Sequence, residues 1–139
     1  MINNFKSVPA ELKKYNKFIV KFPEHLEIQE WAIVKVSNPI YNGNKWENIE
    51  FCFTDPICVS ISEKLIKLIN FAKKQKQKGE SILFVIEMKL LDPCDIVIET
   101  WNISVSEIIK IDLGVFDYEN LNDREPKLII KPHNCKVLI

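Results

Sequence analysis

The sequence predicts a mainly β domain with one α-helix, arranged as an antiparallel β-sandwich or barrel of about seven or eight strands with the helix packed on its outer side. Two observations lead to this prediction. Runs of β-branched and aromatic residues alternate with polar residues, and clusters of Pro, Asn, Asp and Gly separate the runs. One stretch, Ser60 to Lys78, instead repeats its apolar residues at helical spacing, which is typical of an amphipathic helix.

The 139 residues are enough for one domain with its own hydrophobic core. We expect residues 1–14 to form an N-terminal arm and residues 15–139 to form the β domain. At the start of that domain, Tyr15 to Phe22 alternates between apolar and polar residues as far as Pro23. This pattern predicts a half-buried strand.

A second strand is predicted at Leu26 to Val36 and a third at Lys45 to Phe53. Both faces of the second strand carry apolar groups, so we expect one face in the core and the other covered by another element or another subunit. The Asn42-Gly43 pair favours the positive φ angles of a tight turn. It predicts a hairpin that joins these two strands.

The predicted helix has signals at both ends. Ser60 and Glu63 match a capping box, and Gly79 is the natural C-cap residue. A strand is then predicted at Ser81 to Leu91, and Leu90 to Ile139 is expected to form a series of short strands. The predicted breaks in that last third are Asp92-Pro93, Gly114 to Tyr118, and Asn120 to Pro126.

Composition and charge argue against several classes of protein. Nineteen basic residues balance nineteen acidic residues, so no overall field draws the chain to nucleic acid or to an anionic membrane. No apolar run is long enough for a membrane anchor, and the N-terminus lacks the apolar centre of a secretion signal. With only Gly43, Gly79 and Gly114, the chain contains no glycine-rich phosphate-binding motif.

No constellation of residues predicts catalysis. His25 and His133 lie far apart, no serine or cysteine stands in a nucleophile turn, and the four cysteines contain no C-x-x-C pair. We therefore expect buried free thiols, no enzyme activity, no cofactor and no metal. The alternative is a zinc site built from Cys135 with His133 and Cys94, since a strand would point His133 and Cys135 to one face.

The three tryptophans are more informative than any titratable residue. Trp31, Trp46 and Trp101 all fall on predicted strands, and residues of this size are prominent both in cores and at interfaces. Together with a strand that is apolar on both faces, they indicate a domain that buries part of its surface only when it assembles.

The order of motifs in the last third resembles the C-terminal pattern of the tail tube proteins of contractile-tailed bacteriophages. Its N-terminal half is similar in order too, so the resemblance covers residues 15–139. The motifs that carry it are the Asn16 to Phe22 strand, a strand ending near Pro39, Trp46 to Ile49, a D-P break before the helix, Asp92-Pro93, Glu99-Thr100-Trp101, Ile111 to Gly114, Asp117-Tyr118, and the strand Lys127 to Lys131.

This resemblance implies a structural protein of a virion tail. Copies of the chain would form rings, hexameric in this family, whose inner sheets join into one barrel around a channel, and the stacked rings would conduct the phage genome. The tubes of R-type tailocins and of type VI secretion share the fold, as do tail initiator and terminator proteins. The implied partners are further copies, adjacent rings, and sheath, terminator or baseplate proteins. DNA would only pass non-specifically through the lumen. The protein would be made in the cytoplasm of the host bacterium.

The resemblance also implies two groups of contact residues. The hairpin is expected to contact the adjacent ring, and four aromatic residues are expected to hold the strand packing or the subunit interface. The turn from Pro39 to Lys45 is shorter than in the family's tube subunits, which leaves room for a neck or tail-end component. The hairpin residues are Pro39, Ile40, Tyr41, Asn42, Asn44, Lys45 and Trp46, and the aromatic residues are Trp31, Trp101, Phe116 and Tyr118.

A second interpretation is a β-barrel module that binds a small ligand or a protein and works as a monomer or a dimer. It predicts one sizeable apolar pocket and a closed barrel without free edges. The sequence leaves open the ring number, the tail type, the place along the tail, the host and the residues that face the lumen.

Overall fold

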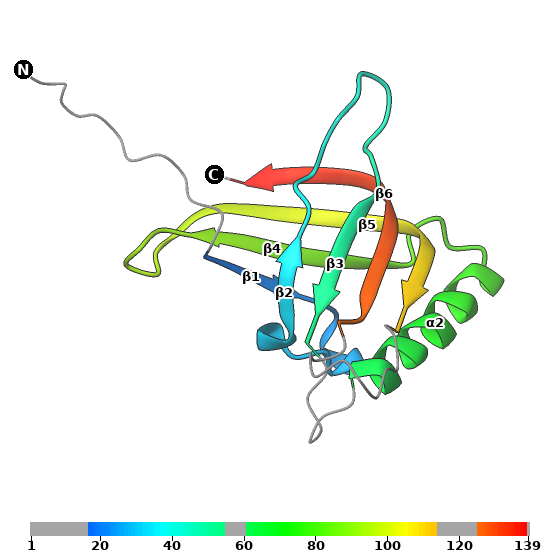
Figure 1. Ribbon diagram of the computed structural model, residues 1–139. Helices are drawn as coiled ribbons and strands as arrows, with labels where there is room; N and C mark the ends of the chain where they lie inside the picture. Colours follow the sequence, from blue (N-terminus) through cyan, green and yellow to red (C-terminus); the bar gives the residue numbers. More distant parts are fainter. Residues whose placement is uncertain (1–16, 55–60, 114–124, 139) are drawn as a thin grey trace, which may run out of the picture.

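The computed structural model describes residues 17–54, 61–113 and 125–138. Within these residues six antiparallel strands form a single sheet beside one α-helix (Figure 1). The predicted class is confirmed, with slightly fewer strands than expected. The elements are β1 (Phe18–Lys21), η1 (Glu24–Leu26), η2 (Glu30–Ala32), β2 (Ile33–Val36), β3 (Ile49–Phe53), α2 (Ile61–Gln77), β4 (Phe84–Leu91), β5 (Val97–Asp112) and β6 (Lys127–Leu138), where η marks a 3-10 helix.

The sheet is curled into a nearly closed barrel. Its strand order is β1-β4-β5-β6-β3-β2, so β1 and β2 are the edge strands. The curl brings the two edges toward each other, and Lys21 Nζ in β1 lies 3.8 Å from Glu30 Oε1 just before β2. The long strand β5 belongs to both halves of the barrel, β1-β4-β5 and β2-β3-β6-β5. It pairs with β4 near its start and with β6 over most of its length.

The prediction of a series of short strands in the last third is wrong. The break at Asp92-Pro93 is confirmed, and the Asp92 carboxylate accepts hydrogen bonds from the backbone N–H groups of Cys94 and Ile96 at 2.8 and 2.9 Å. After it come two long strands, β5 and β6. Pro132 lies within β6, where the register shifts beside it and a bulge tolerates the missing N–H. The other predicted breaks lie largely outside the described residues.

The prediction that a strand runs from Leu26 to Val36 is also wrong for the first part of this range. The chain there forms η1 and η2, and Glu27 between them has a φ of 55° in the left-handed region. Leu26, Ile28 and Ala32 are nevertheless buried, so the 3-10 turns place in the core the apolar side chains that a strand would also have buried. Only Ile33–Val36 joins the sheet, as β2.

The helix is confirmed as α2, although Ser60 of the capping box lies outside the described residues. Gly79 ends it with a φ of 79°, where the N–H of Gly79 bonds the carbonyl of Lys76 at 3.0 Å and the N–H of Glu80 bonds that of Gln75 at 3.1 Å. These two bonds form a Schellman motif. The helix lies along the side of the sheet beyond β5 and buries one apolar face, consisting of Ile61, Leu65, Leu68 and Ala72 (Figure 1).

The interior of the curled sheet is filled by side chains. Phe22 joins the two halves of the barrel, since its ring centroid lies 5.6 Å from that of Phe51 in β3 and 6.3 Å from that of Phe84 in β4. Buried apolar residues from all six strands complete this core, including Val20 and Ile33 of the edge strands. Those with no exposed surface include Ile49, Ile86, Ile103, Val105, Leu128 and Ile130.

Replacing Ile86 by Ala should lower the free energy of unfolding by about 2–5 kcal/mol, because a fully buried side chain leaves a cavity that the core fills only in part. Urea unfolding followed by circular dichroism measures this loss. The matched control is Val85→Ala, since Val85 is the neighbouring residue on β4 with 47% of its surface exposed, and a change within about 0.5 kcal/mol is expected. Equal losses in the two variants would contradict the assigned faces of β4.

Candidate assembly surfaces

The loop between β2 and β3 is the most prominent projection of the described chain (Figure 1). The predicted tight turn is confirmed: the N–H of Asn42 donates to the carbonyl of Lys45 at 3.1 Å, Tyr41 bridges to Trp46, and Gly43 has a φ of 102°. The returning strand, however, begins at Ile49 rather than at Lys45. The connection therefore spans residues 37–48 and is longer than the sequence indicated.

This longer connection arises because the ladder opens on either side of the turn. At its base the Ser37 hydroxyl accepts the backbone N–H of Glu50 at 2.9 Å, so a side chain takes the place of one ladder bond. Between Ser37 and Ile40 stands Pro39, which has no N–H to donate. The loop consequently stands away from the sheet.

Aromatic contacts anchor the loop to the barrel. Trp46 makes edge-to-face contacts with Tyr41, at 5.2 Å between ring centroids, and with Trp101 of β5, at 6.1 Å. Trp101 Nε1 in turn donates a hydrogen bond of 2.6 Å to the buried carboxylate of Glu99. Trp101 therefore packs within its own copy and supports the loop, while a contact to another copy stays a prediction.

The structure brings all seven residues predicted for contact with an adjacent ring onto this one loop. Pro39 and Trp46 are partly buried, and the remaining five, Ile40, Tyr41, Asn42, Asn44 and Lys45, are exposed. Trp31 lies elsewhere, on η2, and is 56% exposed. Phe116 and Tyr118 lie outside the described residues.

Two strand edges are open on opposite sides of the half-sheet β2-β3-β6-β5. The pairing of β4 with β5 ends at Phe84 and Val105, where the N–H of Leu83 makes one last bond to the carbonyl of Val105 at 2.8 Å. Beyond that point, from Glu107 to Ile111, β6 is the one strand among the described residues that pairs with β5. The outer edge of β2 also has no partner strand within the described chain. Unpaired edges of this kind can extend a sheet into a neighbouring molecule.

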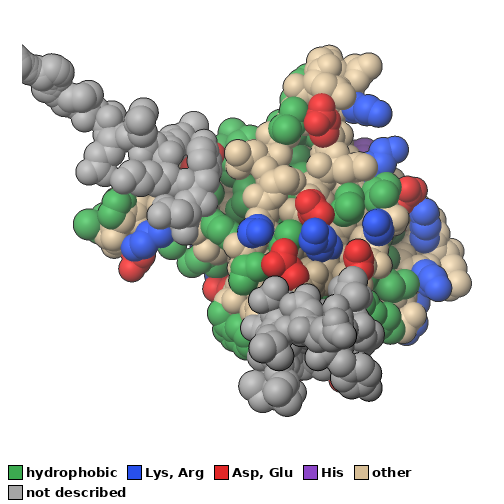
Figure 2. Space-filling model, viewed as in Figure 1, with side chains coloured by type: hydrophobic (Ala, Val, Ile, Leu, Met, Phe, Trp, Pro, Cys, Tyr) green, Lys and Arg blue, Asp and Glu red, His purple; other side chains and the backbone are tan. Residues whose placement is uncertain are grey.

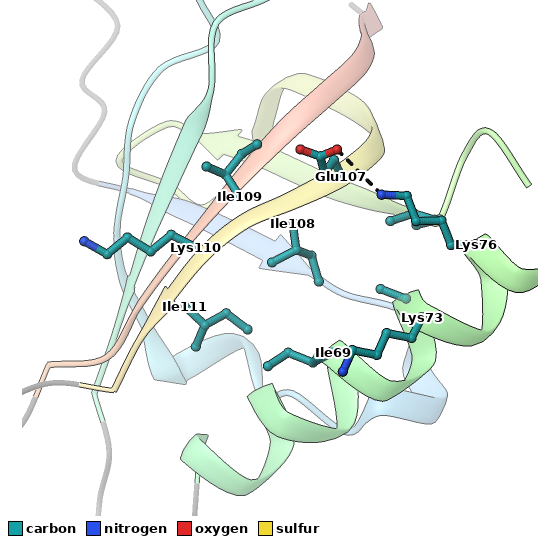
Figure 3. A pocket seen from close by; sticks show the side chains of 10 residues that line it. Ile69, Lys73, Lys76, Glu107, Ile108, Ile109, Lys110 and Ile111 are labelled. Carbon is teal, nitrogen blue, oxygen red and sulfur yellow. Dashed lines mark ion pairs between the residues drawn. The ribbon is translucent and has the colours of Figure 1, made fainter.

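A groove runs along the open edge of β5 and separates it from α2 (Figure 3). It encloses about 310 Å³, and Ile108 and Ile111 point from β5 toward the helix. Lys76 spans the groove in an ion pair with Glu107, at 3.6 Å between Nζ and Oε1. The sequence reasoning missed this groove; its signal was the run Ile108-Ile109-Lys110-Ile111. The lining consists of Ile69, Ala72, Lys73, Lys76, Leu83, Glu107, Ile108, Ile109, Lys110 and Ile111.

The side chains proposed for a zinc site do not come together. The register shift in β6 turns His133 outward and Cys135 inward, so His133 is exposed while Cys135 is buried. Cys94 is exposed at the turn between β4 and β5. Across the described parts of the chain, no group of three potential metal-ligating side chains is found.

The charged surface is mixed in sign. On the face seen in Figure 2, Lys and acidic side chains are interspersed rather than gathered into one patch. A shallow depression on β3, β6 and β5 shows this in detail, because it is lined by Glu50, Lys110, Asp112 and Lys127. None of the helices described here is long and apolar enough to cross a membrane.

No family model matches the chain, and no curated protein matches its sequence. Solved structures do match over nearly the whole length. A chain of the sheath–tube complex of an extracellular contractile injection system, PVC, in the extended state has 15% identity and a TM-score of 0.65, with 91% of each chain covered. The chain has the fold of contractile-tail tube proteins.

Further matches extend this tube fold to the ends of such assemblies. A chain of the PVC sheath/tube terminator has 16% identity and a TM-score of 0.65, covering 96% of this chain and all of its own. A chain of the anti-feeding prophage tube-terminating cap has 12% identity and a TM-score of 0.62, covering 95% and 93%. These matches are chains of tube, sheath, terminator and cap assemblies.

The cysteines should differ sharply in reactivity. At about pH 8, iodoacetamide should modify the exposed Cys94 and leave Cys135 intact, because burial raises the pKa of the Cys135 thiol to about 11 and only the thiolate reacts. Burial, with the nearby Glu50 carboxylate, also raises the pKa of Cys52. Peptide mapping by mass spectrometry measures the three rates. Protection of Cys135 should be lost in denaturant, and rapid labelling of Cys135 in the folded protein would contradict its placement in the core.

Proposed function

We propose that this protein is a structural component of a contractile phage tail or phage-like tail, and that it forms hexameric rings of a tube or of a tube-like neck or tail-end piece. The observation that carries the proposal is the tube fold, matched over at least nine-tenths of the chain by components of contractile injection systems. The proposal includes ring closure, ring stacking and passage of DNA through the lumen.

The two open edges supply a means of ring formation. Every neighbouring pair in β2-β3-β6-β5 is antiparallel, so the open edge of β5 would meet β2 of the next copy in antiparallel orientation as well. Such a contact joins two different surfaces, and a head-to-tail contact of this type generates a closed ring when its rotation closes. A ring of six is supported by another structural match, the anti-feeding prophage baseplate, which is described as 6-fold symmetrised and has a TM-score of 0.53 at 12% identity.

The projecting loop suits a contact between stacked rings. It projects beyond the ends of β2 and β3 (Figure 1), and its aromatic base holds it in place while Ile40 and Tyr41 remain exposed. Since the loop spans residues 37–48, the shortness of the turn no longer favours a neck or tail-end component over a repeating tube subunit. The proposal therefore covers both a repeating tube subunit and a terminator.

The mixed charges on the outer face of β3, β6 and β5 suit the wall of a DNA channel. Each phosphate neutralised by a lysine adds to affinity for DNA, so a strongly basic wall would hold the genome rather than let it pass. Here Lys110 and Lys127 share their depression with Glu50 and Asp112. In the proposed assembly the protein is made in the host cytoplasm and resides in the virion tail, beside sheath, terminator or baseplate proteins.

The alternative of a ligand-binding barrel receives less support. Such a module needs an enclosed apolar pocket, whereas the interior of this barrel is filled by side chains with no exposed surface. The groove of about 310 Å³ lies outside the barrel and is open along the edge of β5.

The purified full-length chain should form rings or tubes at micromolar concentration. Mass photometry should show a species of six copies, and negative-stain microscopy should show annular particles with a central channel. Unpaired strand edges drive this association. A chain that remains strictly monomeric across the micromolar range would refute the proposal.

Placing a charge on the projecting loop should separate ring formation from stacking. The variant Ile40→Asp changes a side chain that is 50% exposed and leaves the backbone bond from the N–H of Glu47 to the carbonyl of Ile40 in place. Rings are expected to form, while tubes shorten or disappear, because a carboxylate cannot be buried unpaired between rings.

The control for this loop variant is Ile66→Asp, which changes a similarly exposed residue on α2. Tube lengths are measured by electron microscopy at equal protein concentration. Tubes of wild-type length in Ile40→Asp would remove the loop from the stacking contact.

A further inference from the structure

Trp31 faces solvent and not the core. It is 56% exposed on η2, two residues before β2 begins. Val34 in β2 is 45% exposed as well, so the outer side of this edge presents two large apolar groups. Exposed tryptophans near an unpaired strand edge are typical of the anchors of protein interfaces.

The groove between α2 and β5 has an apolar lining that suits a side chain such as that of Trp31. Its floor consists of aliphatic side chains, among them Ile69 and Ala72 from the helix and Ile108 and Ile111 from β5. It is open to solvent along a strand edge that lacks a described partner. A flat aromatic side chain from outside could therefore bury its ring against these residues.

Charge is complementary between the two surfaces. The exposed acids Glu27 and Glu30 both precede Trp31, with Glu30 3.8 Å from Lys21 of its own copy, and the groove carries Lys73 and Lys76 on its helical side. Lys76 is engaged with Glu107, whereas Lys73 makes no ion pair with any residue that the structure describes. Lys73 is thus available to an acid from another molecule.

The strand register places both surfaces at the same end of the half-sheet. Val36 of β2 is level with Phe51 of β3, Phe51 with Leu128 of β6, and Leu128 with Ile111 of β5. Trp31 precedes β2 and so lies toward that end, as Figure 1 also shows for η2 and the lower part of β5. A neighbouring copy whose β2 pairs in antiparallel orientation with residues 106–109 at the open edge of β5 would bring its Trp31 level with Ile111, at the end of the groove formed by Ile69 and Ile111.

We propose that Trp31 of one copy inserts into the groove between α2 and β5 of the next copy, with Glu27 or Glu30 facing Lys73. This contact rests on the proposed ring assembly and gives it an anchor. It also explains why β2 can be so short, since a buried tryptophan adds to the few backbone bonds that a four-residue strand can make.

A nucleic acid is a weaker candidate for the groove. Single strands bind through bases stacked on aromatic side chains, and the lining residues are aliphatic apart from their charged members. A second copy supplies both the apolar anchor and the acids.

The first test is a dilution series of Trp31→Ala by mass photometry. Loss of a central tryptophan anchor should raise the concentration needed for ring formation by about 30-fold or more. Trp46→Ala is the matched control, because Trp46 lies at the base of the projecting loop and ring formation should change little. If Trp31→Ala forms rings at the wild-type concentration, the contact is refuted while the proposed function stands.

The second test detects the contact between two copies by disulfide cross-linking and does not require a complete ring. The variant Trp31→Cys, Lys73→Cys is prepared with Cys94→Ser and Cys58→Ser and is oxidised under mild conditions. Disulfide-linked dimers and higher ladders should appear on non-reducing gels. The control Trp31→Cys, Lys74→Cys moves the second thiol to the neighbouring helical position, which does not line the groove, and should give far less product.

Equal cross-linking of the Lys73 and Lys74 variants would overturn the proposal even if rings form. Specific cross-linking without wild-type rings would support the contact and count against ring closure. A third outcome concerns nucleic acid: if a fluorescent single-stranded oligonucleotide binds wild-type protein and the binding is lost in Lys73→Ala, the groove would be a nucleic-acid site and the proposal would fall.

Discussion

The partial pairing of β5 is the constraint on which the rest of the structure depends. The strand is sixteen residues long, whereas β4 has eight residues and pairs with the first part of it alone. From Thr100 to Val105 the strand is paired on both sides, and beyond Val105 one side faces α2 across a groove. This difference in length closes one half of the barrel and leaves the other half able to continue into another molecule.

The helix and the core make that open edge possible. The groove separates the open edge of β5 from α2, and α2 is fixed by four buried residues that pack into the common core. Phe22 connects the halves of the barrel through its contacts with Phe51 and Phe84, so both halves share one core. The proposed function therefore depends on surfaces, whereas the stability of the molecule comes from the buried core.

Local signals explain which elements were predictable. The helix has apolar residues at helical spacing and Gly79 at its end, and the turn at Asn42-Gly43 needs a positive φ at Gly43; both are formed by neighbouring residues. The interval from Leu26 to Ala32 was predicted wrongly because alternation reports burial, and two 3-10 turns can bury the same residues. His133 and Cys135 were assigned to one face of a strand because no local sequence pattern indicates the bulge between them.

The sequence by itself determined the class of fold, the helix, the principal turns and the exposed character of the loop residues, because these depend on local spacing, backbone preference and polarity. Only the tertiary structure decided which edges remain open, where the groove lies and that Trp31 faces solvent rather than the core. Those features arise from the relative lengths and registers of strands far apart in the chain. The residues of one strand do not indicate where its partner strand ends.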